Sequence, residues 1–161
     1  MNRRTAVWAA ALMCAALVMP ACAHAAADNS VGVWKREVDQ TKYSAPNLNP
    51  IVQMIMTREA IPGGLKIHSV GERKDGTKID YTVSVVYDGK DYPVSGYGSV
   101  FDTIAITATD ANHFPSVTKK GKYQMKGLTV ISPDGKTMTI TNHGTEADGS
   151  PMDFVVVWSK Q

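Results

Sequence analysis

Three histidines beyond residue 25 are the side chains best suited to hold a metal or move a proton: His68, His113 and His143. Metal sites need imidazoles or carboxylates that converge, and closely spaced ligands along one element mark many of them. These histidines are far apart, and no such motif surrounds them. The alternation around His68 and His143 predicts that both face solvent, while His113 falls in a polar turn. We therefore expect neither a metal site nor another cofactor.

Serines and carboxylates form no recognisable catalytic set either. A nucleophile elbow needs Gly-x-Ser-x-Gly, and residues 94–98 have Val94 in place of the first glycine. The acidic residues fall largely in turns, where an Asp side chain hydrogen-bonds the local backbone, or on the polar face of a strand. We predict no catalytic residue, and a barrel enzyme such as an isomerase or hydrolase without a familiar motif is an alternative.

The charge balance argues against binding to nucleic acid. The chain has 17 Lys and Arg and 15 Asp and Glu, and two of the cations, Arg3 and Arg4, lie within the first 25 residues. The rest of the chain is neutral and lacks the positive excess that drives binding to phosphate backbones. The lysine-rich segment 119–126 is better explained as the soluble edge of a hairpin.

Binding of a small apolar molecule is the function that the residue types favour. The side chains expected to point inward include several methionines, whose flexible thioethers adapt to irregular ligands, although methionine also fills gaps in ordinary cores. Tyr81 would carry a hydroxyl inside, where it needs a core acceptor, a water or a ligand. The predicted ligand-binding residues are Trp34, Met54, Met56, Tyr81, Val83, Val85, Met125, Met138 and Phe154.

An aromatic loop offers a second hypothesis. Tyr92, Tyr97 and Phe101 surround a glycine-containing stretch, residues 95–99. Such a loop could contact a protein partner, in which case the domain would have a solid core and act as an interaction module. Loops also bury their own aromatic rings, so the same residues could pack across the end of the fold.

Short alternating segments separated by turns predict an all-β fold. Apolar and polar residues alternate, as expected when one face of a strand is buried and the other is wet. Asp-Gly and Pro-Gly pairs between the segments are typical of tight hairpins. The expected strands are 32–36, 51–59, 64–72, 78–87, 91–95, 103–109, 116–120, 123–131, 136–143 and 151–159. We expect residues 38–50 to form a loop and Gly127 to mark a β-bulge, because the apolar alternation slips there.

A long antiparallel meander must hide its two edges, and closure into a barrel does so. We therefore predict one domain over residues 26–161, a barrel of eight to ten strands. A two-sheet β-sandwich is the alternative.

The first 25 residues resemble a secretory signal peptide. Arg3 and Arg4 precede an apolar run over residues 6–19, and Ala23-His24-Ala25 supplies the small residues of a cleavage site. We expect cleavage, export to the periplasm or beyond, and a monomeric product. A lipoprotein anchored through Cys22 is an alternative. Both cysteines lie in this segment, so the cleaved chain would contain neither a disulfide nor a cysteine nucleophile.

Four motifs carry a likeness to a known group: Gly32-x-Trp34, residues 87–94, residues 132–137 and the closing residues 156–158. With these the chain resembles small secreted bacterial lipocalin-like proteins of unknown function, a calycin-type β-barrel family. The resemblance implies a barrel whose first-strand tryptophan closes one end. Lys160 stands where lipocalins usually place an arginine over that tryptophan. No arginine follows residue 73, so the late-strand arginine clamp of fatty-acid-binding proteins is not implied.

Overall fold

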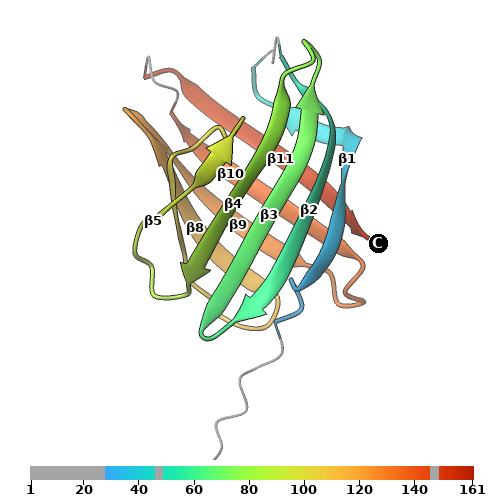
Figure 1. Ribbon diagram of the computed structural model, residues 1–161, viewed down its shortest axis with the longest axis vertical. Coiled ribbons are helices and arrows are strands. Elements are labelled where there is room, and N and C mark those ends of the chain that lie inside the picture. Colours follow the sequence, from blue (N-terminus) through green and yellow to red (C-terminus); the bar gives the residue numbers. More distant parts are fainter. Residues whose placement is uncertain (1–27, 46–48, 146–148) are drawn as a thin grey trace, which may run out of the picture.

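The structure, a computed structural model, describes residues 28–45, 49–145 and 149–161, which form strands and no helix (Figure 1). The predicted signal peptide and both cysteines lie outside these residues. The strands are β1 (Gly32–Tyr43), β2 (Ile51–Ile61), β3 (Gly64–Arg73), β4 (Lys78–Val86), β5 (Tyr92–Pro93), β6 (Ser95–Tyr97), β7 (Thr103–Ile106), β8 (His113–Lys120), β9 (Tyr123–Ile131), β10 (Thr137–Thr145) and β11 (Pro151–Lys160).

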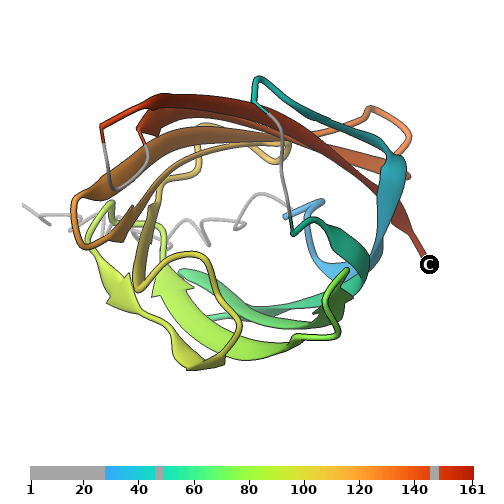
Figure 2. The same cartoon turned by 90° about the horizontal axis from the view of Figure 1, so that it is seen from above.

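All strand pairs are antiparallel, and the sheet order is β5-β7-β8-β9-β10-β11-β1-β2-β3-β4-β6. The last strand pairs with the first, as Arg36 opposite Trp158 shows. Segment 92–97 joins the remaining edges, because its β5 part pairs with β7 and its β6 part pairs with β4. A further bridge links Asp88 to Thr107. The sheet therefore curls into a nearly closed barrel (Figure 2), which confirms the predicted antiparallel barrel over the sandwich.

The first strand is longer than predicted, and the expectation of a loop over residues 38–50 is wrong for its first half. The pairing of β1 with β11 shifts register between Glu37 and Lys42 and then resumes, with Tyr43 opposite Phe154. A bulge of this kind changes which side chains face inward, so the apolar alternation is lost while the strand continues.

The expected bulge at Gly127 is absent. β9 keeps a regular register with both neighbours, and Gly127 lies opposite Ser116 on β8 and Asn142 on β10. A Cβ atom at Gly127 would be 2.6 Å from Ser116 Oγ and 2.8 Å from Asn142 Oδ1. The alternation slips instead because the next residue, Leu128, is an apolar side chain that is 40% exposed on the outer face.

Trp34, near the start of β1, is completely buried. Its Nε1 donates to the Ser30 carbonyl at 2.8 Å, and the ammonium of Lys160 lies 5.1 Å from its ring centroid. Lys160 thus covers the tryptophan, as the resemblance implied for an arginine. Most of the side chains that the alternation placed inside are buried, Met125 included, while Tyr81 and Phe154 are partly buried and pack against the core.

Candidate ligand-binding site

A cavity of about 160 Å³ lies within the barrel. Side chains of β1 to β4 and of β7 to β11 line it, together with Val100 and Phe101 from the loop before β7. Most are apolar. Val100 is exposed, whereas Ile67, Val83 and Trp158 are buried, so the lining extends from the surface into the core.

Two arginines are the charged members of this lining. Arg36 on β1 and Arg58 on β2 are only 8% and 3% exposed. Both point inward for the same reason: Arg36 shares the parity of Trp34, and Arg58 shares that of Met54 and Met56. Burial lowers the pKa of both guanidiniums from the ordinary arginine value, although arginine remains charged at neutral pH.

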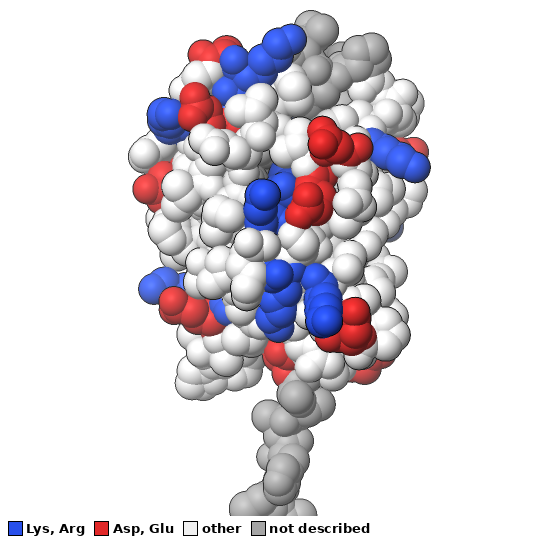
Figure 3. Space-filling view, turned by 90° about the vertical axis from the view of Figure 1, so that its right-hand side faces the viewer, with Lys and Arg blue, Asp and Glu red and all other residues white. Residues whose placement is uncertain are grey.

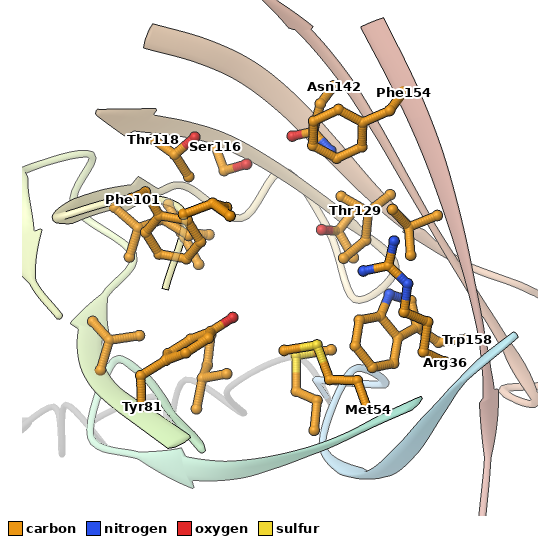
Figure 4. Close-up of a pocket in the computed structure, with 18 of the residues that line it drawn as sticks. Arg36, Met54, Tyr81, Phe101, Ser116, Thr118, Thr129, Asn142, Phe154 and Trp158 are labelled. Carbon is orange, nitrogen blue, oxygen red and sulfur yellow. The ribbon is translucent and has the colours of Figure 1, made fainter. Parts of the chain in front are cut away.

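The contacts of Arg36 leave its Nε without a partner in the part of the chain that the structure describes. Its Nη2 donates to Tyr43 Oη at 2.9 Å, and its Cζ lies 6.0 Å from the ring centroid of Trp158. Its Nε is buried with no hydrogen-bond partner among the described residues, and the same holds for Nε1 of Trp158. Figure 4 shows the Arg36 guanidinium beside this indole in the cavity.

Arg58 lies deeper and is also incompletely paired. Its Nη1 donates to Met138 Sδ at 3.1 Å, and its Cζ lies 5.8 Å from the Phe114 centroid. Its Nε has no partner among the described residues. Burial lowers the pKa of Arg58, whereas the charge of Asp28 raises it and so opposes the effect of burial. The Asp28 carboxylate accepts its hydrogen bonds from Tyr87 and from Ser30.

Several cations on the outside of the barrel have carboxylate partners, which the two arginines lack. Figure 3 shows Lys and Arg interspersed with Asp and Glu on one outer face, and Lys78 for example lies 2.6 Å from Glu72. None of the ion pairs among the described residues includes an arginine. Within the described residues, the interior of the barrel therefore holds two arginine charges that form no ion pair.

A set of uncharged polar side chains lies across the cavity from Tyr81 (Figure 4). They come from three adjacent strands: Ser116 and Thr118 on β8, Thr129 on β9 and Asn142 on β10. The missing side chain of Gly127 leaves room between Ser116 and Asn142. These hydroxyl and amide groups can donate or accept hydrogen bonds.

Tyr81 reaches the cavity from β4, as predicted. Its ring meets Phe101 edge-on, with centroids 5.7 Å apart and planes at 74°. Burial raises the pKa of the Tyr81 phenol, so the hydroxyl stays protonated at neutral pH and can donate a hydrogen bond.

The predicted ligand-binding residues fall into two groups, those that line the cavity and those that lie above or below it in the barrel. Met54, Met56, Tyr81, Val83 and Phe154 line the cavity. The other predicted residues are buried but are not part of its lining: Trp34, Val85, Met125 and Met138. Alternation fixes the side of the sheet on which a side chain lies, but not its height along the barrel axis.

The three aromatic side chains of the loop do not lie on one common surface. Phe101 lines the cavity, Tyr92 packs against the core and Tyr97 is 59% exposed. The interaction-module hypothesis requires a solid core, whereas the barrel contains a cavity.

The three histidines that the structure describes lie on the surface, each beside one carboxylate. Their nearest acidic oxygens are at 2.9 Å (His68 to Asp80), 2.9 Å (His113 to Asp110) and 3.0 Å (His143 to Asp153). In the part of the chain that the structure describes, no three His, Cys, Asp or Glu residues are grouped so as to hold a metal ion. These same residues include no helix long and apolar enough to cross a bilayer.

The chain matches no protein-family model and no curated protein. Its fold is similar to that of the S-type phycobiliprotein lyase from Guillardia theta, with a TM-score of 0.54 and 8% identity over 83% of this chain and 89% of that one. Two structures solved with bound DFHBI are also similar. EF1p2_mFAP2b has a TM-score of 0.44 and 11% identity over 83% of this chain and 94% of its own. The redesigned barrel mFAP1 has a TM-score of 0.43 and 14% identity over 84% and 98%. At these identities the likeness concerns the fold alone.

Proposed function

We propose that this chain is an exported, monomeric binding protein that holds one small, mainly apolar molecule inside its barrel and catalyses no reaction on it. The cavity is the observation that carries this proposal. Its volume is about 160 Å³, and an apolar cavity of ~150 Å³ in another protein is large enough for benzene. The ligand is therefore of the size of one ring or a short carbon chain.

Burial supplies the affinity in this proposal. Each methylene group transferred from water contributes about 0.8 kcal/mol, and a few polar groups set the orientation of the ligand. Met54, Met56, Ile67 and Val83 provide the apolar walls.

The composition of the lining supports the non-enzymatic part of the proposal. Proton transfer at neutral pH usually uses a histidine or a carboxylate with a suitable pKa. Among the described residues, the lining contains neither type. Export rests on the pattern of residues 1–25, and N-terminal sequencing of the protein from its source would test it.

Thermal melting with small aromatic probes tests the binding proposal, because a ligand that binds only the folded state raises Tm. We expect at least one of toluene, benzamide and benzoate to raise the Tm of the chain lacking residues 1–25. V83W would fill the cavity and abolish this effect. V70W, which places the same bulk on the outer face of β3 where Val70 is exposed, would retain it. If none of the three probes changes the Tm, the proposal is wrong.

A further inference from the structure

We propose that the ligand carries a carboxylate, which Arg36 and Trp158 bind inside the barrel while Arg58 adds a second positive charge from deeper in the cavity. The inference rests on the proposed function and specifies the chemistry of the ligand.

The first argument is that two buried charges lack an ion-pair partner. Arg36 and Arg58 are more than nine-tenths buried, line one cavity and form no ion pair with the described residues. A buried cation without a counter-ion destabilises a fold. An apolar side chain of similar size at the same position usually leaves the fold equally stable or more stable. Two such cations in one small cavity therefore indicate that an anion joins them.

The second argument is the direction of the unmet hydrogen bonds. Nε of Arg36, Nε of Arg58 and Nε1 of Trp158 are all buried without partners, and all three are donors. Buried donors almost always have an acceptor. A carboxylate offers only acceptor positions, about four per group, so it complements this set where an alcohol or an amine does not.

The third argument places the carboxylate. Arg36 and Trp158 are directly opposite each other in the register of β1 and β11, and the guanidinium lies next to the indole. Their two free donors thus belong to one small region of the wall (Figure 4). Tyr43 fixes the guanidinium through Nη2, which leaves Nε available to the ligand. A planar guanidinium is also the side chain best shaped to hold a carboxylate.

The apolar part of the ligand then has a defined place. Met54 and Met56 follow the same inward face of β2 as Arg58, and Ile67 and Val83 lie on the neighbouring strands β3 and β4. A short molecule with its carboxylate at Arg36 would place its ring or chain against these side chains.

Benzoate and benzamide test the inference, because they have nearly the same shape and differ in charge. Isothermal titration at low salt of the chain lacking residues 1–25 should show benzoate binding about tenfold more tightly than benzamide. In R36Q we expect this preference to fall to about twofold, and in R58Q to fall by a smaller factor, because Arg58 acts from a greater distance. R73Q is the matched control: Arg73 bonds the carbonyls of Asn49 and Gly98 and does not line the cavity, so the preference should remain.

A second variant covers a failure of R36Q to fold. W158F removes the indole donor together with part of the ring volume and keeps an aromatic side chain, and we expect it to weaken benzoate several-fold more than it weakens benzamide. Equal affinities for benzoate and benzamide in the wild type would overturn the carboxylate inference and leave the proposed function standing. Failure of toluene, benzamide and benzoate alike to bind would overturn both.

Discussion

The guanidinium of Arg36 lies over the indole of Trp158, with Cζ 6.0 Å from the ring centroid, and each of these two side chains retains a buried N–H without an acceptor. A cation and an aromatic ring attract each other, so this contact stabilises the arginine in the absence of a ligand. The contact with the ring gives Nε no hydrogen-bond acceptor. An arginine with a purely structural role would have its N–H groups paired, whereas Arg36 keeps a donor that an anion can use.

Arg58 should destabilise the protein when no ligand is bound. We expect R58M to raise the free energy of unfolding by about 1–3 kcal/mol, because a flexible apolar side chain would replace a buried and unpaired charge. Urea unfolding followed by tryptophan fluorescence measures this. K126M, which removes a charge from an exposed site on β9 outside the cavity, should change stability by less than about 0.5 kcal/mol. A loss of stability in R58M would instead show that the contacts of Arg58 with Met138 and Phe114 are structural.

Tyr87 should make the fold sensitive to alkaline pH. Burial first, and then the hydrogen bond to Asp28 and the charge of Asp28, raise the pKa of the Tyr87 phenol above its usual value. The unfolded chain therefore releases this proton first, near pH ~10, and stability that is complete below that pH is lost as the pH rises further. Equilibrium unfolding between pH 8 and 11 should show this decline. We expect the free energy of unfolding of Y87F to fall less steeply with pH, and that of Y97F, at an exposed site, to fall as in the wild type. Identical slopes for Y87F and wild type would contradict the assignment.

The sequence predicted the faces of the strands better than the site. Alternation placed Trp34 and Tyr81 inside, because a strand with one wet face must alternate. It does not predict height along the barrel axis, so it places Met138 among the ligand-binding residues although Met138 lies outside the lining.

The sequence analysis does not single out Arg36 and Arg58, although the same rule places them inside. A charged residue is expected on the surface by default, and this expectation outweighed the i, i+2 relation of Arg36 to Trp34 and of Arg58 to Met56. An arginine at an inward position of a predicted barrel strand is therefore a signal that sequence analysis can use.

Gly127 should control the shape of the polar wall. In G127A the new Cβ would meet Ser116 Oγ and Asn142 Oδ1 at less than an ordinary contact distance, so at least one of these side chains must move. We expect a loss of about 1–2 kcal/mol in unfolding free energy. L128A, at the next residue but on the exposed outer face, should change stability by no more than about 0.5 kcal/mol. Equal effects of G127A and L128A in urea unfolding would show that the space beside Gly127 has no structural importance.

Lys160 should stabilise the barrel through Trp34. K160M keeps an apolar stem of similar length but removes the ammonium that lies over the ring, and we expect a loss of about 0.5–1 kcal/mol. K160R should keep or improve stability, because a planar guanidinium stacks on an indole better than an ammonium does. K122M, which removes a charge from an exposed turn, is the control for net charge. If K160M and K122M unfold at the same urea concentration, the cation over Trp34 contributes nothing, and the buried indole is held by its packing and by its hydrogen bond to the Ser30 carbonyl.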